Sequence, residues 1–149
     1  MSRYLLVAHQ TAGSVELRAK VVELMRDDAA ADFVLLVPAT PIRFLEAVGG
    51  ESRTAVEVAR SRATLARSLL EDVGARLMAA RIGSHDPMVA IEEELRGGGY
   101  GTVVISTLPP GVSRWLRLDL PARVARRFSE IRVIHVVANS PATTTGRPG

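Results

Sequence analysis

Short apolar runs alternate with helical patterns along most of this chain. Five of the runs are predicted to be strands: Tyr4–Ala8, Phe33–Val37, Leu77–Ile82, Thr102–Ser106 and Arg132–Val137. Tyr4–Ala8 is an unbroken apolar run, which is typical of a strand covered on both faces. Because helical patterns fill the intervals between them, the strands are expected to be parallel and joined by crossover helices. The pattern therefore predicts a three-layer α/β fold around an open, parallel, five-stranded sheet.

The first two helical patterns are long and amphipathic. One follows Ser14, a predicted N-cap, and Glu16 and Lys20 are expected to pair on its wet face. Its apolar stripe comprises Leu17, Val21, Leu24 and Met25. The second is expected from about Ser52 to Val73, after an irregular connection over Ala39–Gly50. Its apolar face comprises Val56, Ala59, Ala63, Ala66, Leu69 and Val73.

The last two helices carry clearer boundary signals. Asp86-Pro87 opens the first, because an acidic N-cap followed by proline at the first helical position favours a helix start. Gly97-Gly98-Gly99 ends it, since glycine adopts the left-handed conformation that is common at helix ends. An arginine-rich helix is predicted over Leu120–Phe128, with Asp119 as its N-cap. That helix would connect the fourth and fifth strands.

All of these elements fall in one predicted domain, residues 1–138 of the 149 in the chain. Residues 139–149 are rich in Ser, Pro, Thr and Gly, which predicts a flexible C-terminal tail. No apolar stretch reaches membrane-spanning length, and the N-terminus does not resemble a signal peptide. We therefore expect a cytoplasmic location without membrane contact.

Composition removes several kinds of chemistry. The chain has no cysteine, so disulfides, thiolate metal sites and a cysteine nucleophile are excluded. Its net charge is only +3, and the arginines of the last third have no interleaved aromatic residues, so nucleic-acid binding is not expected. The sequence contains no phosphate-binding P-loop, dinucleotide fingerprint or nucleophile elbow. We predict no catalytic residue and no metal site, and an enzyme is the weaker hypothesis.

Ligands of open α/β sheets gather where the strands end. The loops at those ends are His9–Gly13, Pro38–Pro41, Gly83–Asp86 and Ser106–Ser113. His9 and His85 could converge there as metal ligands or as an acid and a base, but Asp86 beside His85 is better explained as a cap. Trp115 and His135 are expected to be structural.

Three stretches of the chain resemble the universal stress protein family: Tyr4–Ala8, Gly83–Ile91 and Thr102–Val137. The resemblance covers nearly the whole chain to Ala138. It implies a universal-stress-protein, Rossmann-like sheet of order 3-2-1-4-5, with a ligand crevice between strands one and four. It also implies a homodimer formed through the last strand, Arg132 to Val137.

Nucleotide-binding members of that family carry a motif after strand four: glycine, two residues, glycine, nine residues, glycine, and serine or threonine. Starting at Ser106, the same spacing falls on Pro109, Asp119 and Leu120. Proline has no N–H, aspartate brings a negative charge, and leucine has no hydroxyl to offer a phosphate. The resemblance therefore implies a scaffold that is retained and a phosphate site that is degenerate.

The family's acidic residue after strand one is also replaced, since it falls near His9 or Gln10. The candidate crevice comprises His9, Gln10, Val37, Pro38, Ser106, Thr107, Pro109, Gly111, Ser113, Arg114, Arg117, Asp119 and Leu120. The leading interpretation is a dimeric, non-catalytic binding or regulatory module linked to stress, without a cofactor and with a small anionic ligand as one candidate.

Two alternatives remain open. The first is an adenine-nucleotide binder that holds ATP or AMP in a rearranged phosphate site, with Thr107, Arg114 and Arg117 as its ligands. The second is a hydrolase or transferase of the wider fold group that uses His9 or His85.

Overall fold

One sheet of five parallel strands organises the protein. The computed structural model describes residues 2–41 and 54–139. The strands are β1 (Arg3–Val7), β2 (Asp32–Pro38), β3 (Leu77–Gly83), β4 (Thr102–Thr107) and β5 (Arg132–Val137). Their order is β3-β2-β1-β4-β5 and every neighbouring pair is parallel, which confirms the predicted fold class and strand order. Each strand boundary lies within one residue of its prediction.

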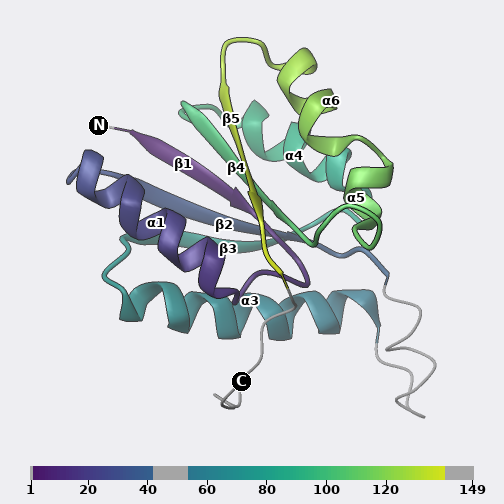
Figure 1. Ribbon diagram of the computed structural model, residues 1–149, viewed down its shortest axis with the longest axis horizontal. Helices are drawn as coiled ribbons and strands as arrows, with labels where there is room; N and C mark the ends of the chain where they lie inside the picture. Colours follow the sequence, from purple (N-terminus) through teal and green to yellow (C-terminus); the bar gives the residue numbers. More distant parts are fainter. Residues whose placement is uncertain (1, 42–53, 140–149) are drawn as a thin grey trace.

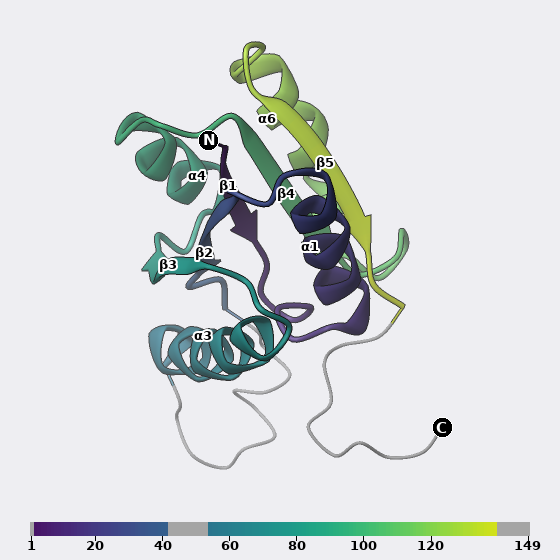
Figure 2. The same cartoon turned by 90° about the vertical axis from the view of Figure 1, so that its left-hand side faces the viewer.

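Helices cover both faces of this sheet (Figure 1). The helices are α1 (Val15–Asp27), α3 (Ala55–Asp72), α4 (Pro87–Arg96), α5 (Arg114–Arg117) and α6 (Leu120–Arg127). α1 and α3 lie on one face, and α4, α5 and α6 lie on the other, as the turned view in Figure 2 also shows. Among the described residues, no helix has the length and apolar character needed to cross a membrane.

The core fills both sides of the sheet, because successive side chains of a strand point to opposite faces. In β1, Leu6 packs with the α1 and α3 layer, whereas Leu5 and Val7 pack with the α4 to α6 layer. β2 and β4 are buried along their whole length, while β3 and β5 are the two edges of the sheet. Each fully buried aliphatic side chain contributes about 1.5–3 kcal/mol, so the central strands hold the site-bearing edge rigidly.

Two of the predicted N-caps are confirmed. Ser14 Oγ accepts a hydrogen bond from the Leu17 amide at 3.1 Å. Asp86 Oδ1 accepts from the Met88 amide at 2.9 Å, directly before Pro87. The predicted glycine stop of α4 is also confirmed, because the two glycines at positions 98 and 99 have φ values of 84° and 93°.

The predicted pair between Glu16 and Lys20 is wrong. Lys20 instead pairs with Glu23, three residues further along α1. Glu16 lies in the first turn of α1, and its Oε2 accepts hydrogen bonds from the backbone and side-chain nitrogens of Asn139, both at 3.3 Å. This contact joins the start of α1 to the chain just beyond β5.

The helix α3 begins after Thr54, whose side chain and that of Glu57 form a capping box. The start predicted near Ser52 lies outside the described residues, as do most of the preceding connection and residues 140–149 of the predicted tail.

The apolar stripe of α3 differs in part from its prediction. Ala59, Ala63 and Ala66 are buried as expected. Leu70 is buried in the last turn, whereas Val56 in the first turn is 42% exposed. The buried stripe is therefore displaced around the helix relative to the predicted face.

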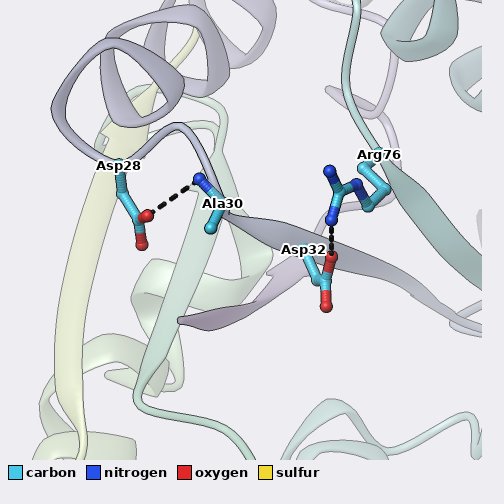
Figure 3. Close-up of polar contacts among 4 residues, drawn as sticks. All are labelled: Asp28, Ala30, Asp32 and Arg76. Carbon is cyan, nitrogen blue, oxygen red and sulfur yellow. Dashed lines mark hydrogen bonds and ion pairs between the residues drawn. The ribbon is translucent and has the colours of Figure 1, made fainter. Parts of the chain in front are cut away.

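Polar contacts fix the amino end of the sheet, the end away from the candidate site (Figure 3). Asp28 Oδ1 accepts a hydrogen bond from the Ala30 amide at 3.0 Å in the turn after α1. Hydrogen bonds from Ser2 and then Ala30 lower the pKa of the Asp28 carboxyl. Arg76 Nη1 lies 3.4 Å from Asp32 Oδ1, which ties the first residue of β2 to the residue before β3.

Candidate functional site

A cavity of about 210 Å³ lies at the carboxyl edge of the sheet. It is lined by His9, Gln10, Thr11, Thr40, Pro41, Ser106, Thr107, Leu108, Ser113, Arg114 and Trp115. These residues follow β1, β2 and β4 or begin α5. They converge because parallel strands all end at the same edge of a sheet, and the turn in strand order between β1 and β4 leaves a crevice there.

Part of the predicted crevice lines this cavity. The predicted residues in its wall are His9, Gln10, Ser106, Thr107, Ser113 and Arg114. The predicted residues outside the wall are Val37, Pro38, Pro109, Gly111, Arg117, Asp119 and Leu120. Val37 and Leu120 instead pack in the apolar clusters on the two faces of the sheet.

Some lining residues were missed by sequence reasoning. Thr11, Thr40, Pro41 and Leu108 all lie in the strand-end loops that the sequence indicates, but they were not among the predicted crevice residues. Trp115 was expected to be structural, and it both packs in the core and lines the cavity. A tryptophan that covers a pocket was the alternative to a purely structural Trp115, although α5 itself was not predicted.

Hydroxyl groups occupy the floor of the cavity between β1 and β4. Thr11 Oγ1 and Ser106 Oγ are 2.6 Å apart, and both residues are buried. Thr107 Oγ1 donates to the Leu108 carbonyl at 2.8 Å and also lies 2.8 Å from His135 Nε2. Since one hydroxyl has one proton, the His135 Nε2–H is the donor in the second bond.

His9 presents an unsatisfied imidazole to the cavity. Its side chain is only 4% exposed, and neither ring nitrogen has a hydrogen-bond partner among the described residues. Burial, and then the positive charge of Arg62 on α3, lower the pKa of His9 from 6.5 to about 4. The ring is therefore neutral at physiological pH, with one donor and one acceptor.

The two histidines of the sequence-based metal or acid–base alternative differ in their surroundings. His85 is exposed and does not line the cavity, although its backbone carbonyl accepts a hydrogen bond from Thr40 Oγ1 at 3.1 Å. Within residues 2–41 and 54–139, no group of three or more His, Cys, Asp or Glu side chains is placed to hold a metal ion.

Several backbone amides in the segment after β4 donate hydrogen bonds within that segment. The N–H groups of Val112 and Ser113 both donate to the Pro109 carbonyl, at 3.1 and 3.0 Å. Ser113 Oγ accepts from the Leu116 amide at 3.2 Å and so begins α5. The Asp119 amide donates to the Leu116 carbonyl at 3.0 Å. These groups already have partners inside the segment, so they are not free to bind a phosphate.

The cap predicted at Asp119 is wrong in its chemistry. Asp119 does occupy the N-cap position of α6, but its backbone is left-handed, with φ 56° and ψ 38°, and its side chain makes no capping hydrogen bond. A capping side chain normally reaches the helix amides from an extended backbone. The carboxylate of Asp119 instead lies 3.8 Å from Arg126 Nη2, and both side chains are exposed.

Comparisons with known proteins find the same fold. No protein-family model and no curated protein matches the chain. Among solved structures, a universal stress protein in complex with cAMP is 18% identical, with 93% of this chain and 97% of that chain covered and a TM-score of 0.54. An Arabidopsis thaliana universal stress protein family protein with AMP bound is 11% identical, with 93% of each chain covered and a TM-score of 0.59.

Proposed function

Because the chain has the fold of the universal stress proteins, we propose that it is a small non-catalytic binding module. Its ligand site is the cavity at the carboxyl ends of β1 and β4. The observation that carries this proposal is the unpartnered, buried ring of His9 in a wall that otherwise consists of hydroxyls, one amide, one guanidinium and apolar groups. Such a wall suits recognition by hydrogen bonds and stacking.

The module is expected to bind triphosphates weakly. Pro109 offers no amide, Leu120 is buried and has no hydroxyl, and Asp119 brings a carboxylate. Each lost hydrogen bond to a charged group is worth about 1.5–3 kcal/mol. Two such losses weaken affinity by roughly a hundredfold to ten-thousandfold, so we expect ATP to bind no tighter than the high-micromolar range.

An adenine nucleotide with a single phosphate is the second candidate ligand. The observation that favours it is the presence of Thr107 and Arg114 in the cavity wall, where they can meet one anionic group. Two proteins of the same fold hold cAMP and AMP. Arg117, the third residue of this hypothesis, does not line the cavity.

Calorimetric titration with ATP, AMP and cAMP tests whether the cavity binds an adenine nucleotide with one phosphate and whether ATP binds as weakly as expected. Arg114→Ala should weaken AMP binding by about tenfold or more, the value of one charge-assisted hydrogen bond. Arg117→Ala is the matched control, because Arg117 lies on the same short helix and is exposed but does not line the cavity. Low-micromolar ATP affinity in the unmodified protein would contradict the degenerate phosphate site.

The proposal includes a homodimer formed through β5. Val133, Ile134, Val136 and Val137 give this edge strand an apolar character, and its outer side has no neighbouring strand in the sheet. Antiparallel pairing of two β5 strands around a two-fold axis would satisfy the free backbone groups.

A further inference from the structure

His9 is the buried polar group that the fold leaves unsatisfied at its ligand cavity. Both of its ring nitrogens lack a hydrogen-bond partner among residues 2–41 and 54–139, although the residue is only 4% exposed. Buried polar side chains of native proteins are almost always hydrogen-bonded. Because His9 also lines the cavity, a ligand in that cavity can reach the ring.

Within residues 2–41 and 54–139, the charged side chains that act on His9 or line its cavity are positive. Arg62 on α3 lies close enough for its charge to act on the imidazole, and Arg114 on α5 lines the same cavity. His85, in the loop after β3, is exposed beyond Thr40 at the rim. No carboxylate is present in the described wall of the cavity. The site therefore favours a negative ligand over a positive one.

We propose that this cavity binds a small organic anion with its charge against His9, and that binding places a proton from solvent on the imidazole. The inference rests on the proposed binding function, and it adds the charge of the ligand and the role of His9. A protonated ring has two donors and no acceptor, so it binds an anion better than a neutral ring does.

The sign of the resulting pH dependence follows from the free protein. Burial and Arg62 hold the pKa of free His9 at about 4, so the empty site is neutral above that pH. A bound anion raises the pKa, because it stabilises the imidazolium. Affinity therefore increases as pH falls between the bound and the free pKa, by at most about tenfold per pH unit for one proton.

Titration calorimetry with cAMP tests this, because its phosphodiester keeps one negative charge throughout the range from about pH 8 to about pH 5. In the unmodified protein, affinity should rise as pH falls, and buffers of different ionisation enthalpy should report uptake of up to about one proton. His9→Gln keeps one donor and one acceptor but cannot take a proton, so its affinity should not vary in this way. His85→Gln is the control, because His85 is exposed and does not line the cavity, and it should retain the unmodified dependence.

Inorganic sulfate serves as a second probe. Binding of cAMP with the same pH dependence in the unmodified protein and in His9→Gln overturns the proton coupling and leaves the binding module intact. Binding of sulfate with the expected dependence, but not of cAMP, supports the anion site and removes the nucleotide candidate. If neither cAMP nor sulfate binds between about pH 8 and about pH 5, both the coupling and the proposed site are wrong.

Discussion

His9 makes the folded protein sensitive to acid. Its pKa is lowered from 6.5 to about 4 by burial and by Arg62, so the unfolded chain takes up the proton first as pH falls. Folding stability should therefore decrease from about pH 6.5 down to about pH 4, by about 1.4 kcal/mol per pH unit and roughly 3 kcal/mol in total. Above that range the ring is neutral in both states and contributes no dependence.

Urea unfolding at several pH values measures this effect. His9→Gln should flatten the decrease, whereas His85→Gln should leave it unchanged because His85 is exposed. The same slope in His9→Gln as in the unmodified protein would assign the acid sensitivity to other groups.

Helix caps show how far local sequence chemistry predicts structure. At Asp86-Pro87 the proline directly follows the cap and keeps it extended, so the side chain reaches the Met88 amide as predicted. In α6, Pro121 stands two residues after Asp119 rather than one, so the proline restricts the backbone of Leu120 and not that of Asp119. Asp119 is then left to adopt the left-handed backbone. The spacing between aspartate and proline therefore distinguishes the two cases, and the residue types alone do not.

At the scale of the element, the segment from β4 to α6 is held together by local structure. Several of its backbone amides donate hydrogen bonds within the segment. Leu120 packs in the same core cluster as Trp115 and Val124. Placing glycine and serine at positions 119 and 120 would therefore not by itself be expected to create a phosphate site in this segment.

Single substitutions at positions 119 and 120 should have very different effects on the free energy of unfolding. Leu120→Ser removes a fully buried side chain and should destabilise the fold by about 2–5 kcal/mol. Asp119→Gly should change it by less than about 1 kcal/mol, because glycine adopts a positive φ readily. Urea unfolding measures both, with Leu118→Ser as the exposed control. Equal losses at Leu120 and Leu118 would contradict the packing.

The strands and long helices were predictable because each is set by its own periodicity, and α5 was not. Four residues give no helical repeat to detect, and this helix depends on Ser113 as a cap and on Trp115 packing in the core. The candidate site was predictable to the level of loops. Which side chain of each loop turns inward depends on packing between elements, as Thr11 against Ser106 illustrates.

At the scale of the whole molecule, alternation of strands and helices predicts a parallel sheet but not its strand order. The order came from the family resemblance, and the structure confirms it. Assembly through β5 stays a prediction. The backbone amides of Arg132 and Ala138 donate toward β4 and its flanks, so the alternating amides of Val133, His135 and Val137 face the open edge.

Sedimentation at micromolar concentration should show a dimer for the unmodified protein. Val137→Pro removes an outward amide without breaking a bond to β4, so it should shift the equilibrium toward the monomer. Val137→Ala keeps that amide and is the control. A monomeric unmodified protein would refute the assembly.

Thr107 lines the cavity, and its hydroxyl also lies 2.8 Å from His135 Nε2 on the edge strand β5. A ligand that recruits this hydroxyl would compete with the imidazole of a residue whose own amide faces the open edge. If the chain dimerises through β5 as proposed, ligand binding would change the dimerisation constant, and dimerisation would change the ligand affinity by the same factor.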